Sequence, residues 1–279
     1  MMKKIGKLAA LAVAGMMVSG GSICAYAAAE AGAAAGPGVI RDAGASTKAN
    51  AGENVMQDVT QSGIQTAQKN ESGIDIARLA AAQEADKVIV VVGTGMDSAR
   101  ITAAYFKKAE DGSWNEEFYV PGYCGFNGMA ADKKEGDRRT PVGTYGFTKA
   151  FGILDDPGSI LPYKVLDEYD YWVDDGSSKY YNQMVSAKTT PVTWKSAEHL
   201  IKVNPCYNYS LALDYNEACV PGKGSAIFLH GLHPTKTWTE GCIAIPEENM
   251  KTLIQQADEN TRIVVVPDAS QLTYTGAAE

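Results

Sequence analysis

This 279-residue sequence is poor in cysteine, in basic charge and in long apolar segments, and each shortage excludes a class of protein. Five cysteines are too few for a small scaffold held together by disulfides, so the fold must depend on its own apolar core. The formal net charge of -8 leaves no basic excess for a phosphate backbone, and we expect no nucleic-acid partner. Hydrophobic residues at 45% and charged residues at 21% exclude collagen, coiled-coil and wholly disordered chains.

One uncharged apolar run lies near the beginning of the chain, at residues 8–18. It follows three lysines and precedes an A-x-A site at residues 25–27, a pattern typical of a secretory signal peptide. The run is shorter than the ~20 residues that cross a bilayer. We therefore expect residues 1–27 to be removed and the mature protein to be extracellular or associated with the cell wall. Nucleotide cofactors are not supplied there, and we expect none.

The remaining chain divides by composition. Residues 28–72 are rich in Ala, Gly, Ser, Asn and Gln and have no aromatic side chain, which predicts a disordered tether. A short lead-in helix is expected over residues 73–86, with Ser72 as its N-cap. The catalytic domain is expected over residues 87–267, and residues 268–279 are expected to be a C-terminal tail. Cys206 and Cys219 flank a strand-like stretch and could form a disulfide or remain two buried thiols.

From Lys87 onward, short runs of β-branched and aromatic residues alternate with turn residues, which predicts a mainly β domain with few helices. The runs lie at residues 88–92, 118–120, 145–147, 211–213, 226–229 and 263–266. The best helix is expected from Pro246 to Asp258, because Met250, Leu253 and Ile254 would share one apolar face.

Three other patterns have ordinary structural explanations. The turn Gly93-Thr94-Gly95 follows an apolar run, as in dinucleotide-binding sites, but the third glycine is replaced by Ser98, so a hairpin is favoured. The charged run at residues 134–143 could bind an anion, although its composition also fits a tight loop that enters a strand. The aromatic residues between positions 163 and 194 could line a ligand groove, but we expect them to pack a sheet.

The informative segment contains a histidine and a cysteine. An apolar run ends at His230, and twelve residues later Cys242 follows Gly241 and precedes the predicted helix. An imidazole can take the proton of a thiol, the thiolate can attack a carbonyl, and the backbone N–H groups of Gly241 and Cys242 can hold the oxyanion. We expect the histidine and the nearby helix N-terminus to lower the pKa of Cys242.

Two alternatives compete with a catalytic pair. Cys242 could be a buried structural thiol, although the glycine beside it suggests an exposed backbone. Zinc could be bound by His230, His233 and Cys242. A spacing of three residues in an extended chain does not place both histidines on one face, so we expect no metal.

The segments Gly224–His230 (GSAIFLH) and Thr239–Cys242 (TEGC) resemble the L,D-transpeptidase catalytic domain, the YkuD-type family of peptidoglycan enzymes. Residues 134–143 and 180–182 support the resemblance. It implies a β-sandwich of mixed sheets in which Cys242 is the nucleophile and His230 is the base and then the acid. The implied substrate is a peptidoglycan stem tetrapeptide, from which D-Ala is released while an acyl-enzyme forms.

The resemblance also implies the fate of that acyl-enzyme and the setting of the reaction. A second stem's amine would give a 3-3 crosslink, and water would make the protein an L,D-carboxypeptidase. We further assign substrate binding to His233, Thr239, Tyr181 and Asn182. The family is expected to influence cell shape and to be a carbapenem target, and we expect a monomer without a cofactor.

The chain departs from the commonest form of the family motif. Glu240 stands where a second histidine is usual, Ala244 stands in place of an Asn or Arg, and the interval between His230 and Cys242 is shorter. Papain-like and NlpC/P60-type peptidases have their cysteine before their histidine, and sortases have a longer interval. A non-catalytic module that binds the cell wall through its Tyr and Trp residues is the remaining alternative.

Overall fold

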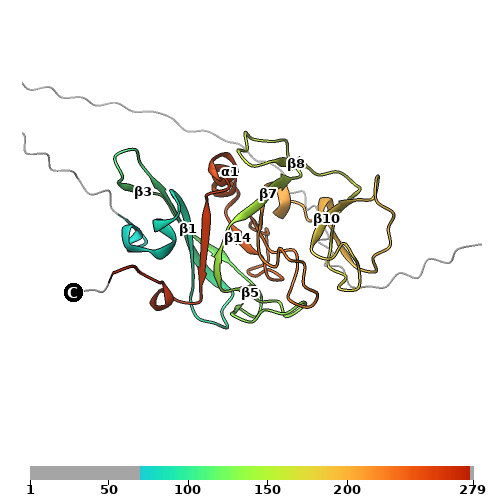
Figure 1. The fold of residues 1–279 in the computed structure, drawn as a ribbon, viewed down its shortest axis with the longest axis horizontal. Coiled ribbons are helices and arrows are strands. Elements are labelled where there is room, and N and C mark those ends of the chain that lie inside the picture. Colours follow the sequence, from blue (N-terminus) through green and yellow to red (C-terminus); the bar gives the residue numbers. More distant parts are fainter. Residues whose placement is uncertain (1–69, 277–279) are drawn as a thin grey trace, which may run out of the picture.

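The computed structural model describes residues 70–276 (Figure 1). The predicted signal peptide and nearly all of the predicted tether lie outside the described residues. No helix within residues 70–276 is long and apolar enough to cross a membrane.

In this described part, ten strands form one mixed sheet. In spatial order they are β6 (Gly143–Tyr145), β15 (Arg262–Val266), β1 (Lys87–Gly93), β2 (Arg100–Lys108), β3 (Trp114–Tyr123), β14 (Ile243–Ile245), β13 (Phe228–Gly231), β12 (Ser210–Leu213), β7 (Phe147–Gly152) and β8 (Tyr163–Val165). The β1–β15, β13–β14 and β7–β8 pairs are parallel, and the other neighbours are antiparallel.

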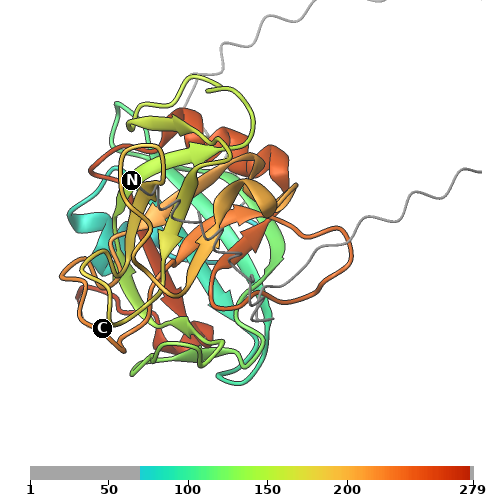
Figure 2. The ribbon, with the colours of Figure 1, turned by 90° about the vertical axis from the view of Figure 1, so that its right-hand side faces the viewer.

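Two smaller sheets and several helices complete the fold. The three-stranded sheet has the order β10 (Gln183–Ser186), β9 (Asp170–Val173) and β11 (Ala197–His199), and β4 (Met129–Ala130) pairs with β5 (Thr140–Pro141). The α-helix is α1 (Glu247–Gln256), and the 3-10 helices are η1 (Ile76–Arg78), η2 (Ala80–Gln83), η3 (Leu200–Lys202), η4 (Cys206–Asn208) and η5 (Ala269–Gln271). Figure 1 shows β10 at one end of the molecule and β3 toward the other, and this β10 end faces the viewer in Figure 2.

The main sheet curls on itself. A single residue, Gly146, separates β6 from β7, yet these strands occupy the first and ninth places in the sheet order. Because one residue spans less than about 4 Å, the two strands must lie close together in space. The curl gives the sheet an interior. The strands and the few helices of the described residues confirm the predicted mainly β fold of mixed sheets. The run expected at residues 145–147 is divided at this link between two strands.

Strand β1 shows why its sequence is a continuous apolar run. Ile89 and Val91 belong to the main core cluster, and Val88 and Val90 belong to a second cluster on the opposite face. A strand that is buried on both faces needs apolar side chains at every position. The predicted hairpin after Val92 is confirmed, because β1 pairs antiparallel with β2.

Helix α1 covers the main cluster with the predicted face. Met250, Leu253 and Ile254 are fully buried there. The helix begins at Glu247, after Pro246 as its N-cap.

The lead-in segment differs from the expected single helix. Two 3-10 helices, η1 and η2, are separated at Leu79, whose backbone is extended and forms a bridge with Tyr274. The helix is interrupted because Leu79 and the N–H of Ala80 pair with the chain near Thr273. Part of the predicted tail therefore packs against the domain, and Leu272 is buried in the second cluster.

The two cysteines considered for a bridge are thiols. Cys206 is buried, whereas Cys219 is partly exposed.

Candidate active site

The site lies where β13 and β14 run parallel beside one another. His230 is in β13 and pairs with Ala244 of β14, and Cys242 immediately precedes β14. Hydrogen bonds between parallel strands fix the relative positions of residues that are separated along the sequence by the connecting segment. The sheet therefore holds His230 within one strand and Cys242 at the start of the neighbouring strand.

Backbone groups surround the thiol of Cys242. Its Sγ accepts a hydrogen bond from the N–H of Phe228 at 3.4 Å and donates one to the carbonyl oxygen of Ala226 at 3.2 Å. The residue is 8% exposed and belongs to a third core cluster with Phe228 and Tyr207. Within the described residues no hydrogen bond joins this thiol to His230, so proton transfer requires the thiol to turn away from Ala226.

The prediction that the pKa of Cys242 is lowered is wrong. Burial raises the pKa of the thiol to about 12, and the Glu198 carboxylate adds to the rise. The Phe228 N–H and the Lys133 ammonium act in the opposite direction but are outweighed. Helix α1 also begins five residues later, at Glu247, so no helix N-terminus lies at the cysteine.

His230 is held in one tautomer by its neighbour in the chain. Its Nδ1 lies 2.8 Å from the carbonyl oxygen of Gly231, and a carbonyl can only accept, so Nδ1 carries the proton. Nε2 is then the basic nitrogen of the neutral ring. Burial lowers the pKa of His230 to about 4, so the ring is neutral near pH 7.

The turn before Cys242 is braced by two threonines. Thr239 Oγ1 donates to the carbonyl of Cys242 at 2.6 Å and accepts from the N–H of Gly241 at 3.1 Å. Thr140 Oγ1 donates to the carbonyl of Gly241 at 2.8 Å. Position 241 requires glycine, because its φ is +143° and a Cβ would lie 3.0 Å from the carbonyl oxygen of Arg139.

The L,D-transpeptidase catalytic domain model, YkuD, matches residues 82–265. The chain belongs to this family. Among curated proteins, no relative matches. The solved "Structure of the Ldtfm-avibactam carbamoyl enzyme" is similar at 13% identity and a TM-score of 0.30, covering 65% of this chain and 49% of that one. An L,D-transpeptidase from Stackebrandtia nassauensis is similar at 14% identity and a TM-score of 0.28, covering 66% of this chain and 56% of that one. This chain thus spans about half the length of those two.

The oxyanion role remains a prediction for this L,D-transpeptidase domain. The N–H of Gly241 is held by Thr239 Oγ1, so it must leave that oxygen before it can bind an oxyanion. Thr239 itself is 8% exposed, and its hydroxyl is used inside the turn.

Two residues assigned to substrate are bonded to the backbone of the segment that contacts the thiol. Tyr181 is 2% exposed, and its hydroxyl donates to Glu135 and accepts from the N–H of Gly224. Asn182 Oδ1 accepts from the N–H of Ala226 at 3.0 Å. Both side chains support the segment whose Ala226 carbonyl accepts the hydrogen bond from the Cys242 thiol. Contact of Tyr181 and Asn182 with substrate stays a prediction.

His233 closes the loop that follows β13. Its Nδ1 accepts hydrogen bonds from the N–H groups of Thr235 at 3.1 Å and Lys236 at 3.0 Å. Among residues 70–276, no group of three His, Cys, Asp or Glu side chains is placed to hold a metal ion. The zinc alternative therefore has no converging ligand set in this part of the chain.

Sequence reasoning missed a buried ion pair beside the turn. Lys133 is 5% exposed, its Nζ lies 2.8 Å from Asp137 Oδ1, and it is 3.4 Å from the position of a Cβ built on Gly241. A buried charge requires a partner, and Asp137 also accepts from the N–H groups of Lys134 and Arg139. The charged run at residues 134–143 was the available signal.

Sequence reasoning also missed Tyr207 and Glu198. The Tyr207 hydroxyl donates to Glu198 Oε1 at 3.0 Å, and the Tyr207 ring meets His230 edge-on with 5.2 Å between centroids. Burial raises the pKa of Glu198 to about 7. Nothing in the local sequence marks either residue, because β11 and η4 bring them to the site only in the folded protein.

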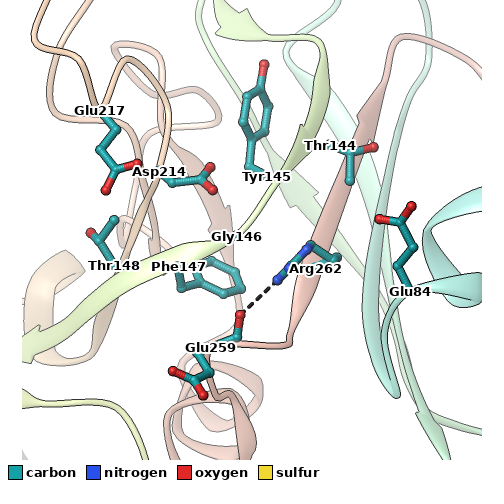
Figure 3. Close-up of a pocket in the computed structure, with 10 residues that line it drawn as sticks. All are labelled: Glu84, Thr144, Tyr145, Gly146, Phe147, Thr148, Asp214, Glu217, Glu259 and Arg262. Atoms are coloured by element: carbon teal, nitrogen blue, oxygen red, sulfur yellow. Dashed lines mark hydrogen bonds between the residues drawn. The ribbon is translucent and has the colours of Figure 1, made fainter.

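A hollow of about 580 Å³ lies elsewhere (Figure 3). Four acidic residues, Glu84, Asp214, Glu217 and Glu259, line it together with Arg262. In Figure 3 the guanidinium of Arg262 points to the backbone carbonyl of Glu259, which accepts its hydrogen bond. None of the assigned site residues lines this hollow.

Proposed function

We propose that this protein is a peptidoglycan L,D-transpeptidase that forms an acyl-enzyme on Cys242. The observation that carries the proposal is the hydrogen bond from the Nδ1–H of His230 to the carbonyl of Gly231, which leaves Nε2 as the basic nitrogen of a neutral ring. The parallel pairing of β13 with β14 and the membership of the family support it. Cys242 and His230 are the catalytic residues of the proposal.

Acylation would begin from two neutral groups. The thiol has a raised pKa and the imidazole a lowered one, so a preformed thiolate–imidazolium pair is disfavoured. The thiol proton would therefore pass to Nε2 of His230 as sulfur attacks the carbonyl carbon of the third stem residue. The C–N bond to the terminal D-Ala then breaks, its nitrogen takes the proton from His230, and a thioester remains on Cys242.

The thioester has two acceptors. The side-chain amine of a second stem would attack the thioester carbon and lose a proton to His230. His230 would then give that proton to the departing sulfur as the 3-3 crosslink forms. Water would follow the same route and leave a tripeptide. We propose that these events take place outside the cell, on the basis of the signal peptide predicted at residues 1–27.

The test is covalent labelling of the protein lacking residues 1–27. Incubation with a stem tetrapeptide, and separately with a carbapenem, should give a mass increase that maps to Cys242. Cys242→Ala should abolish both adducts, and Cys219→Ala, which removes a different thiol, should retain them. His230→Ala should lower the acylation rate by about 10²- to 10⁴-fold. A fully active Cys242→Ala protein would disprove the proposal.

Product analysis assigns the acceptor. Cell-wall material digested after incubation with the protein should contain 3-3 dimers if crosslinking dominates, and shortened tripeptides if hydrolysis does. Adducts that persist in EDTA would exclude the zinc mechanism, which requires loss of activity on chelation. A wall-binding module would bind the same material and form no adduct.

A further inference from the structure

Arg138 and Glu240 form a two-pronged ion pair beside the nucleophile. Arg138 Nε lies 2.7 Å from Glu240 Oε2, and its Nη2 lies 3.2 Å from Oε1. Two parallel N–H···O bonds of this kind are the strongest and most directional way in which a protein holds a carboxylate. The pair is partly open to solvent, with side-chain exposures of 35% for Arg138 and 54% for Glu240.

Two aromatic rings hold the guanidinium independently of Glu240. Its central carbon lies 4.2 Å from the centroid of the Phe126 ring and 4.7 Å from that of Trp238. The two rings meet edge-on with 5.2 Å between centroids. Stacking on aromatic faces restrains an arginine without using its hydrogen-bond donors. Arg138 should therefore stay in place, with its donors available, when Glu240 moves away.

The backbone places this arginine alongside the catalytic turn. The N–H of Phe126 donates to the carbonyl of Thr239, and Thr140 Oγ1 donates to the carbonyl of Gly241. The segment that contains Arg138 thus runs beside the segment from Glu240 to Cys242.

We propose that Arg138 binds the terminal carboxylate of the residue that leaves the stem peptide, and that Glu240 occupies this subsite until the substrate displaces it. The inference rests on the proposed function, because release of a single terminal residue requires recognition of a free carboxylate next to the scissile bond. The exchange replaces one carboxylate with another on the same donors. Glu240 is 54% exposed, so water can hydrate its carboxylate after release, while Arg138 keeps a carboxylate partner before and after the exchange.

A second cation favours an anionic ligand at the same place. Lys236 Nζ lies 5.1 Å from the centroid of the Trp238 ring. Once the Glu240 carboxylate leaves, two positive side chains remain around the ring, and an incoming carboxylate restores the charge balance. The proposed exchange of carboxylates involves Arg138, Glu240 and their neighbours, and it does not require reaction of the Cys242 thiol.

The experiment compares a stem tetrapeptide that has a free terminal carboxylate with the same peptide as its terminal amide. The wild-type protein should acylate from the acid about 10- to 100-fold faster, as kcat/KM, because charge-assisted hydrogen bonds of this kind are worth that factor. Arg138→Asn should bring the ratio close to one, mainly through KM. Asn suits this position because the φ of Arg138 is +59°. Arg138→Lys, which keeps the charge and loses the fork, should retain only part of the preference.

Two further variants sharpen the comparison. Arg139→Gln removes a neighbouring cation whose guanidinium instead pairs with Asp97, and it should keep the wild-type ratio. Glu240→Gln should lower KM for the acid several-fold and leave KM for the amide unchanged, because the internal competitor has lost its charge.

Binding to Cys242→Ala, measured by calorimetry, separates this inference from the proposed function. Tighter binding of the acid than of the amide, lost on adding Arg138→Asn, supports the subsite even if the wild-type protein never acylates. Equal binding of acid and amide to Cys242→Ala, or an undiminished preference in Arg138→Asn, would overturn it. If Arg138→Asn does not fold, an undiminished preference for the acid in Arg138→Lys would overturn the inference instead.

Discussion

The side-chain oxygen of Asn182 accepts a hydrogen bond from the backbone N–H of Ala226, with 3.0 Å between Oδ1 and N. The Ala226 carbonyl in turn accepts a hydrogen bond from the thiol of Cys242. Both Asn182 and Ala226 have left-handed backbone conformations, with φ of 55° and 53°. A side chain from the edge of the small sheet therefore holds an unusual backbone conformation that the nucleophile depends on.

Asn182→Ala should destabilise the protein and slow acylation. The change removes the acceptor for Ala226 and for Trp172 Nε1, and each buried donor left without a partner costs about 1–3 kcal/mol. Urea denaturation should show a lower midpoint with an unchanged m-value. Asn208→Ala is the matched control, since it removes an exposed bond to Glu247. Equal midpoints for the two variants would contradict the structural role of Asn182.

The pH dependence of stability should contain a term from His230 that rises with pH. Its pKa is lowered from 6.5 to about 4, so between these values the unfolded chain binds a proton that the folded one does not. This contribution is fully present above pH 6.5 and is lost as the pH falls toward 4. By about 1.36 kcal/mol per pKa unit it amounts to roughly 3 kcal/mol. His230→Gln should flatten the stability curve in this window.

Glu198 should contribute a term of the opposite sign. Its pKa is raised from 4.5 to about 7, so the folded protein binds a proton that the unfolded chain has lost. This stability is fully present below pH 4.5 and is lost as the pH rises through 7. Glu198→Gln should therefore steepen the rise of stability with pH between 4.5 and 7, measured by urea titrations at closely spaced pH values. A curve unaltered by the substitution would show that Glu198 is ionised in the folded protein.

Alkylation at neutral pH should favour Cys219 over Cys242. Cys242 is buried and the pKa of its thiol is raised to about 12, whereas Cys219 is partly exposed. Thiolate is the nucleophile that attacks iodoacetamide and displaces its iodide, so peptide mapping after a short exposure should find the label on Cys219 first. Cys219→Ser should remove this early label and leave acylation by substrate intact. Early labelling of Cys242 would mean that its thiolate is populated without substrate.

The sequence allowed several strands and helix α1 to be predicted, and it supplied the two residues proposed to be catalytic, because each depends on local patterns. The run at residues 88–92 is buried on both faces, and His230 and Cys242 lie in motifs that can be read directly. The supporting residues could not be predicted in the same way. Tyr207 and Glu198 reach His230 only through tertiary packing, and the raised pKa of Cys242 results from burial that no neighbouring residue reveals.

Residues 70–86 should be required for stability, whereas residues 1–69 should not. Ile74, Ile76 and Leu79 are 6%, 6% and 1% exposed and pack against β1, β2 and β15 in the second core cluster. Burying each such side chain contributes about 1.5–3 kcal/mol, so a chain that begins at Lys87 should lose several kcal/mol or fail to fold.

A chain that begins at Asn70 keeps these contacts and the bonds from Glu71 and Ser72 to Glu116, and its melting temperature should equal that of the protein lacking residues 1–27. Leu79→Ala in the longer chain is the point-mutation counterpart, with an expected loss of about 2–5 kcal/mol. A markedly lower melting temperature for the chain that begins at Asn70 would show that residues 28–69 belong to the folded domain, against their predicted role as a tether.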